Sequence, residues 1–121
     1  MTAEPRAVAA AYFDAWKAND PAALRALLAD DATFAGPMGH AEGADELATA
    51  IQRLFSITKD VLIQQVTADD GDVMTWFDLY TTVAPPTAVV NWSRVRDGKI
   101  IRVLATFDPR DIIAGLSAQS G

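Results

Sequence analysis

The first half of the chain carries the hydrophobic periodicity of amphipathic helices. Within residues 3–19, Val8, Tyr12 and Trp16 recur every four positions, so they share one face of a predicted helix. A second helix is predicted over residues 20–31, because an aspartate suited to the N-cap is followed by a proline suited to the first turn.

The period of the pattern then shortens to about two residues, which is typical of strands. A third predicted helix, residues 44–55, comes before this change. Four predicted strands follow, residues 61–67, 73–83, 88–95 and 99–107, separated by turns rich in glycine, aspartate or proline. Helices followed by a meander of strands predict an α+β fold, in which N-terminal helices pack on one face of a strongly curved antiparallel sheet.

Length and composition fit one globular domain spanning residues 1–121, with a frayed tail predicted from about residue 116. The net charge of −6 argues against nucleic acid as a partner, because an acidic chain repels phosphate backbones. No apolar run approaches the roughly 20 residues of a membrane span, and the N-terminal residues lack a signal-peptide pattern. Without cysteine, thiolate chemistry is excluded. We expect a cytoplasmic protein without a membrane partner.

Two long segments resemble a known superfamily. They are "AYFDAWKANDPAALRALLADDATFAGPMG", residues 11–39, and "VRDGKIIRVLATFDPRDI", residues 95–112. Together with the meander between them, they resemble the nuclear transport factor 2-like superfamily, in particular its SnoaL-like (polyketide-cyclase-like) and ketosteroid-isomerase-like branch. The resemblance implies a cone-shaped α+β barrel, with a bent sheet around helices and an apolar pocket at one end. The fold alone does not fix the reaction, because it hosts isomerases, cyclases, epoxide hydrolases and non-catalytic binders.

The resemblance also implies a set of polar site residues. Ketosteroid isomerases use a tyrosine of the first helix and a protonated aspartate of the sheet as oxyanion donors. Tyr12 matches the tyrosine, and the aspartate position falls on Asn91. The position of the catalytic base falls on Gly36, so a ketosteroid isomerase of the usual mechanism is not expected.

Another base could be supplied by the strand "VMTWFDLY". Met74, Trp76 and Asp78 share one face of this strand, because side chains alternate. The superfamily register turns that face toward the pocket, where desolvation would raise the pKa of the carboxyl and make it a better base or acid. The competing register, shifted by one residue, buries Phe77 and Leu79 instead and exposes Asp78.

The turn "GPMGH" offers a second candidate base, His40, whose imidazole suits proton transfer. The alternative interpretation is a solvated loop histidine outside the pocket. We expect the turn to form the rim, with Pro37 fixing the backbone and Met38 turned inward as an apolar wall.

Other apolar residues are expected to line or floor the pocket, although each fits a plain core position as well. They are Trp16, Phe34, Met38, Phe55, Met74, Trp76, Val103 and Phe107. One histidine without matching carboxylate spacing predicts no metal site, and no phosphate-binding glycine loop is present.

Two functional hypotheses follow. The first is a cofactor-independent enzyme of isomerase, cyclase or hydrolase type. It would act on a small apolar carbonyl or epoxide compound, with Asp78 or His40 moving a proton and Tyr12 and Asn91 stabilising charge on oxygen. The second is a non-catalytic protein that binds or scaffolds a small ligand, which the loss of a base at Gly36 favours.

A homodimer is also expected, through the outer face of the sheet. In the register used above, that face carries more apolar surface than a monomer usually leaves in water. Its residues are Thr75, Phe77, Leu79, Val90 and Trp92.

Overall fold

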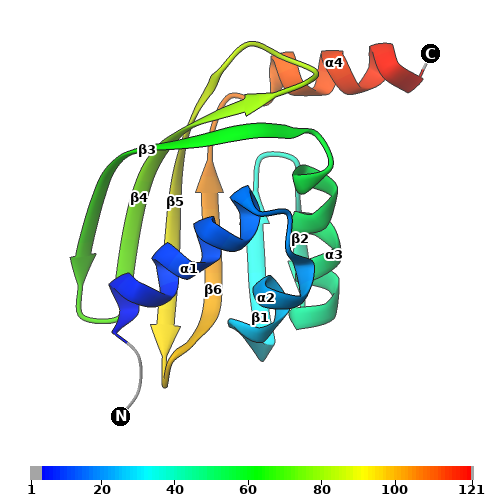
Figure 1. The fold of residues 1–121 in the computed structure, drawn as a ribbon. Helices are drawn as coiled ribbons and strands as arrows, with labels where there is room; N and C mark the ends of the chain where they lie inside the picture. Colours follow the sequence, from blue (N-terminus) through cyan, green and yellow to red (C-terminus); the bar gives the residue numbers. More distant parts are fainter. Residues whose placement is uncertain (1–3, 121) are drawn as a thin grey trace.

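The computed structural model describes residues 4–120 and has the α+β architecture predicted from the sequence (Figure 1). The helices are α1 (Pro5–Lys17), α2 (Pro21–Ala26), α3 (Ala44–Phe55) and α4 (Arg110–Ser120). The strands are β1 (Leu28–Gly36), β2 (Gly39–Glu42), β3 (Thr58–Asp69), β4 (Asp72–Thr81), β5 (Thr87–Arg96) and β6 (Lys99–Thr106). No helix in residues 4–120 has the length and apolar character needed to span a membrane.

The six strands form one curved sheet in the order β2-β1-β6-β5-β4-β3. Neighbouring strands are antiparallel except β1 and β6, which run parallel. The sheet is therefore mixed, and it is open, because β2 and β3 remain edge strands. The predicted antiparallel barrel is wrong in these two respects, while the cone built on a strongly curved sheet is confirmed.

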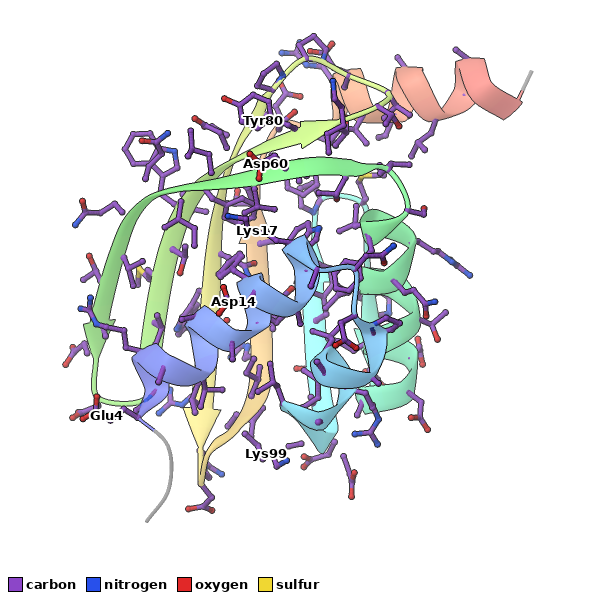
Figure 2. All side chains as sticks on the ribbon, in the orientation of Figure 1. Glu4, Asp14, Lys17, Asp60, Tyr80 and Lys99 are labelled. Carbon is purple, nitrogen blue, oxygen red and sulfur yellow. The ribbon has the colours of Figure 1, made fainter. Side chains whose placement is uncertain are left out.

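Helix α1 lies across the concave side of the sheet, and α3 packs against β1 and β2 at its other end (Figure 1). One side of α1 is buried and includes Tyr12, Phe13 and Trp16. The opposite side is polar: Asp14 and Lys17, labelled in Figure 2, are exposed. This division matches the apolar stripe predicted from the sequence.

Three elements differ from the sequence prediction. The second helix ends at Ala26, and the chain then enters β1, which replaces the predicted end of that helix. The carbonyl of Leu27 accepts a hydrogen bond from the backbone N–H of Ile100 at 2.8 Å, so pairing with the sheet overrides local helical preference here. The turn predicted at residues 36–39 leads into β2, a strand that was not predicted.

The third difference is α4, which includes most of the residues predicted to form a frayed tail, whereas Gly121 lies outside the described range. Ile112 anchors this helix because its side chain is completely buried. Gly115 passes so close to the carbonyl of Val83 that a Cβ would not fit. A backbone contact of this kind leaves no hydrophobic pattern in the sequence.

An aromatic cluster determines which face of β4 is buried. The ring of Phe77 lies 5.0 Å from that of Phe13 and 5.5 Å from that of Trp16, both on α1, in edge-to-face geometry. Strand alternation then buries Thr75 and Leu79 on the same concave face.

The predicted facing of Met74, Trp76 and Asp78 is therefore wrong. All three lie on the convex face, where Met74 is 49% exposed and Trp76 48%. The competing register is the one observed, because its residues offer more apolar surface to α1. The predicted apolar outer face is corrected accordingly: Thr75, Phe77 and Leu79 are covered by the helices.

The facing predicted for β5 is confirmed. Asn91 is buried on the concave face, directly across from Thr75. Val90, 40% exposed, and the half-buried Trp92 lie on the convex face.

The two faces of β4 predict opposite responses to truncation. Phe77→Ala should lower the free energy of unfolding by about 3–5 kcal/mol, because it leaves a cavity within the aromatic cluster. Trp76→Ala should change it by less than about 1 kcal/mol in dilute protein, because its ring is half in solvent. Urea denaturation followed by circular dichroism measures both values, and the reverse order would contradict the facing described above.

Candidate functional site

A row of residues crosses the concave face of the sheet and joins two of the positions expected to carry function. Asn91 lies opposite Thr75 on β4 and opposite Ala105 on β6. On the far side, the carbonyl oxygen of Ala105 lies 3.5 Å from the point where a Cβ on Gly36 would stand. The expected donor on β5 and the vacant base position on β1 therefore lie in one row, which we call the inner row.

Tyr12 lies on α1, on the side that packs against this face, and its side chain is only 2% exposed. Its ring makes edge-to-face contacts with Phe13 at 5.1 Å and Trp16 at 6.1 Å. Burial raises the pKa of the Tyr12 phenol well above its usual range, and the neighbouring side chain of Asn91 partly opposes this rise. The phenol therefore stays neutral at physiological pH and is available as an O–H donor.

Asn91 is the one polar side chain with an unpaired buried atom in the part of the chain that the structure describes. The side chain is 3% exposed, and Nδ2 has no partner in hydrogen-bond geometry within residues 4–120. The Asn91 side chain acts on the pKa of the Tyr12 phenol through a hydrogen-bonding interaction, although Nδ2 and the phenol do not reach full hydrogen-bond geometry in the structure. A buried donor left unpaired costs about 1–3 kcal/mol, so its retention calls for a physical reason.

The β1–β2 turn, the C-terminal end of α3 and the end of β6 lie at the same end of the cone (Figure 1). A pocket of about 270 Å³ is lined by residues of these segments. We call it the rim pocket. It is lined by Phe34, Gly36, Met38, Gly39, His40, Ala50, Arg53, Leu54 and Phe107.

Phe34 connects the rim pocket with the inner row. Its ring atoms Cζ and Cε1 lie 3.3 and 3.4 Å from the position of a Cβ on Gly36. A side chain at position 36 would meet this ring, so the glycine leaves room for it. Phe34 and Gly36 both line the rim pocket, so the Gly36 end of the inner row borders this pocket directly.

The structure divides the residues predicted to line the pocket. Phe34, Met38 and Phe107 lie at the rim pocket, and Met38 remains 42% exposed there. Three others belong to the buried core, and none of them lines the rim pocket: Trp16, Phe55 and Val103. Met74 and Trp76 are on the convex face, as described above. Arg53 was missed, although its spacing from Ala50 and Leu54, at i, i+3 and i+4 on α3, was a usable signal.

Neither candidate base faces the inner row. Asp78 lies on the convex face and accepts a hydrogen bond from Gln64 Nε2 at 2.9 Å. His40 is at the rim, directly across from the exposed Ala35 and next to the buried Ala41. Paired residues of antiparallel strands share a face, so its side chain points the same way as that of Ala35 rather than inward. Within residues 4–120, histidine and acidic side chains form no cluster that could hold a metal ion.

Solved structures of the same fold are numerous. An NTF2-like protein of unknown function from Cytophaga hutchinsonii aligns with a TM-score of 0.81 and 21% identity, over 93% of this chain and 97% of that one. An LEH-like epoxide hydrolase from M. tuberculosis aligns with a TM-score of 0.77 and 24% identity, over 97% of this chain and 92% of that one. A candidate ketosteroid isomerase from Kribbella flavida aligns with a TM-score of 0.77 and 21% identity, over 86% of this chain and 77% of that one. At these identities the likeness establishes the fold.

No curated protein sequence matches the chain. The family model that matches is the SnoaL-like domain, over residues 9–103. This stretch runs from the middle of α1 into β6 and includes Tyr12, Gly36 and Asn91. The chain belongs to the SnoaL-like domain family.

Proposed function

We propose that the protein binds a small, largely apolar compound and holds one of its oxygen acceptors between the Tyr12 hydroxyl and the Asn91 amide. The observation that carries this proposal is the unpaired Nδ2 of Asn91, a donor that is 97% buried beside a second donor. A carbonyl oxygen has two lone pairs and can accept from both groups at once.

Ligand entry through the rim pocket involves Phe34. The pocket is apolar on most of its surface and large enough for a compound of one or two rings. Phe34 lines it, whereas Tyr12 and Asn91 do not, so the ligand has to pass the Phe34 ring to reach the two donors. Rotation of this ring is therefore part of the proposed binding step. Gly36 lacks a side chain that would oppose such rotation.

Binding is better supported than catalysis by the chemistry of these residues. Two donors polarise a carbonyl and stabilise negative charge on its oxygen, but an isomerisation or cyclisation also needs a group that accepts a proton. Gly36 offers none, and Asp78 and His40 both point away from the inner row. The donor pair therefore supports ligand recognition without requiring a reaction.

The enzymatic alternative is favoured by the names of relatives, an epoxide hydrolase and a candidate ketosteroid isomerase among them. It would require His40 to act from the rim, through a water molecule or after movement of the β1–β2 turn. On a turned-over substrate, His40→Ala would then abolish the rate while leaving ligand affinity within a few-fold. Equal rates in the native protein and in His40→Ala would exclude a catalytic role for His40.

Asn91→Leu separates ligand recognition from folding. The change should weaken binding of the naphthyl ketone Prodan about 5- to 30-fold, which corresponds to the loss of one hydrogen bond of about 1–2 kcal/mol. It should raise the free energy of unfolding by about 1–2 kcal/mol, because the unpaired donor is removed. Fluorescence titration and urea denaturation measure the two effects.

A ligand without an oxygen acceptor provides the control. N-phenyl-1-naphthylamine should bind the native protein and Asn91→Leu with similar affinity, since it cannot use the donor pair. Prodan affinity that is unchanged in Asn91→Leu would contradict the proposed function. A loss of affinity for both probes would indicate a damaged pocket, which also contradicts a specific contribution of the amide.

We also propose that a second copy of the chain covers the convex face. Trp76 lies beside Val90, and Met74 beside Trp92, so their exposed surfaces form one apolar patch on neighbouring strands. Leu62 on β3, 47% exposed, extends it. Contiguous exposed apolar surface of this kind usually marks an interface.

The charges around this patch fit a two-fold arrangement. Arg94 and Arg102 are paired across β5 and β6 at one end of the patch, where Asp72 forms a salt bridge with Arg94 at 3.6 Å, whereas Asp78 lies at the other end. A two-fold axis crossing the strands near Trp76 and Val90 would place the Asp78 end of one copy against the arginine end of the other. Arg102 stacks on Trp92 at 5.5 Å and has no carboxylate partner within residues 4–120.

Sedimentation velocity at micromolar concentration tests the assembly. We expect the native protein to be a dimer and Trp76→Glu to be a folded monomer, because a charge would be placed in the apolar patch. Asp78→Arg should weaken the dimer, and adding Arg102→Asp to it should restore part of the affinity. A native monomer, or a double variant weaker than Asp78→Arg alone, would refute this arrangement.

A further inference from the structure

The polar side chains around the proposed binding path share one chemical property: they donate hydrogen bonds or carry positive charge. Tyr12 and Asn91 are donors at the inner end. Arg53 and His40 are the two residues with ionisable side chains at the rim pocket, and no carboxylate within residues 4–120 lines it. This absence is notable in a chain with sixteen acidic residues and a net charge of −6.

Arg53 has a position suited to binding a ligand. It follows Ala50 and precedes Leu54 on the face of α3 that lines the rim pocket, yet its side chain is exposed as a whole. A long side chain in this situation lays its methylene groups along an apolar wall and keeps its guanidinium in water. The charge is thus at the mouth of the pocket rather than inside it.

Arg53 also lacks a salt-bridge partner among the described residues. None of the salt bridges within residues 4–120 includes it. By contrast Arg25, on the neighbouring α2, binds both Asp30, at 3.3 Å, and Asp45, at 3.0 Å. The guanidinium of Arg53 therefore keeps its donors available for an anion, and arginine is the side chain best suited to bind a carboxylate in a two-pronged geometry.

We propose that the ligand is an apolar carboxylic acid whose carboxylate binds Arg53 at the mouth of the rim pocket. The inner end of the same compound carries the oxygen acceptor held by Tyr12 and Asn91, a part that rests on the proposed function. The preferred class is then an apolar keto acid, with its two oxygen-bearing groups separated by the apolar body that the rim pocket encloses.

The competing interpretation is a solvated arginine near the C-terminal end of α3, where a positive charge is favourable without any ligand. This interpretation predicts that Arg53 contributes to helix stability and that it has no effect on the affinity difference between a charged and an uncharged ligand. The two can be separated by comparing ligands that differ only in the carboxylate.

The experiment uses a naphthyl ketone of the Prodan type that carries a carboxylate on the amino substituent, at the end of the ring system opposite the ketone, together with its methyl ester. Fluorescence titration gives both affinities for the native protein, for Arg53→Gln and for the control Arg96→Gln. Arg96 is also exposed, but it lies outside the rim pocket. Both substitutions lower the net charge equally and keep most of the side-chain stem.

For the native protein we expect the acid to bind about 3- to 10-fold more tightly than the ester, the range of one partly solvated charge-assisted pair. The preference should shrink at high salt, disappear in Arg53→Gln and persist in Arg96→Gln. Circular dichroism verifies that both variants are folded.

Equal affinity of acid and ester for the native protein would overturn the inference. So would a preference that both variants reduce equally, because it would then depend on net charge. If the acid preference depends on Arg53 while Asn91→Leu has no effect on either probe, the carboxylate site stands and the proposed donor pair fails. If Asn91→Leu weakens the binding of both the acid and the ester while Arg53→Gln changes neither affinity, the donor pair stands and the carboxylate site fails.

Discussion

The contact of Phe77 with Phe13 and Trp16 determines the arrangement of everything else in the cone. It holds α1 on the concave side of the sheet and turns one alternate set of β4 side chains toward the core. Because β4 and β5 are paired in a fixed register, the same contact brings Asn91 to the concave face, in the region covered by Tyr12. The aromatic core and the donor pair thus both depend on which face of β4 packs against α1. A one-residue shift in the register of β4 would disrupt both.

The facing of β4 also gives the concave and convex faces of the sheet different chemical characters. The concave face receives neutral polar groups, among them Asn91 and the hydroxyls of Thr75 and Ser93, whereas the convex face receives Asp78, Arg94 and Arg102 together with exposed apolar side chains. Asp78 is consequently remote from the proposed ligand, and its carboxylate can interact only with solvent, with neighbours on the convex face or with another molecule. Binding of a ligand and association of two copies can then change independently, because no side chain belongs to both faces of the sheet.

The sequence predicted α1, α3 and the four-strand meander because each has a clear hydrophobic period. It did not predict the facing of β4, because both alternate sets contain large apolar residues, such as Phe77 in one and Trp76 in the other. Only the partner helix decides between them. The parallel pairing of β1 with β6 and the contact of Gly115 with Val83 are long-range and leave no local signal. Tyr12 and Asn91 could be found through resemblance, whereas the helical spacing of Arg53 from Ala50 and Leu54 was a signal that went unused until the pocket walls were known.

Gly36 and Asn91 illustrate how the site can be polar without being reactive. An unpaired amide lowers stability, so it is expected to persist where a ligand supplies the missing acceptor. A base at position 36 would have to share its space with the ring of Phe34, which now lies 3.3 Å from where a Cβ would stand. Steric occupation by an aromatic ring therefore replaces the carboxylate that proton abstraction would require. The same ring can move aside for a ligand, whereas it cannot accept a proton, and this difference in chemistry is why the inner row favours recognition of an oxygen atom over its conversion.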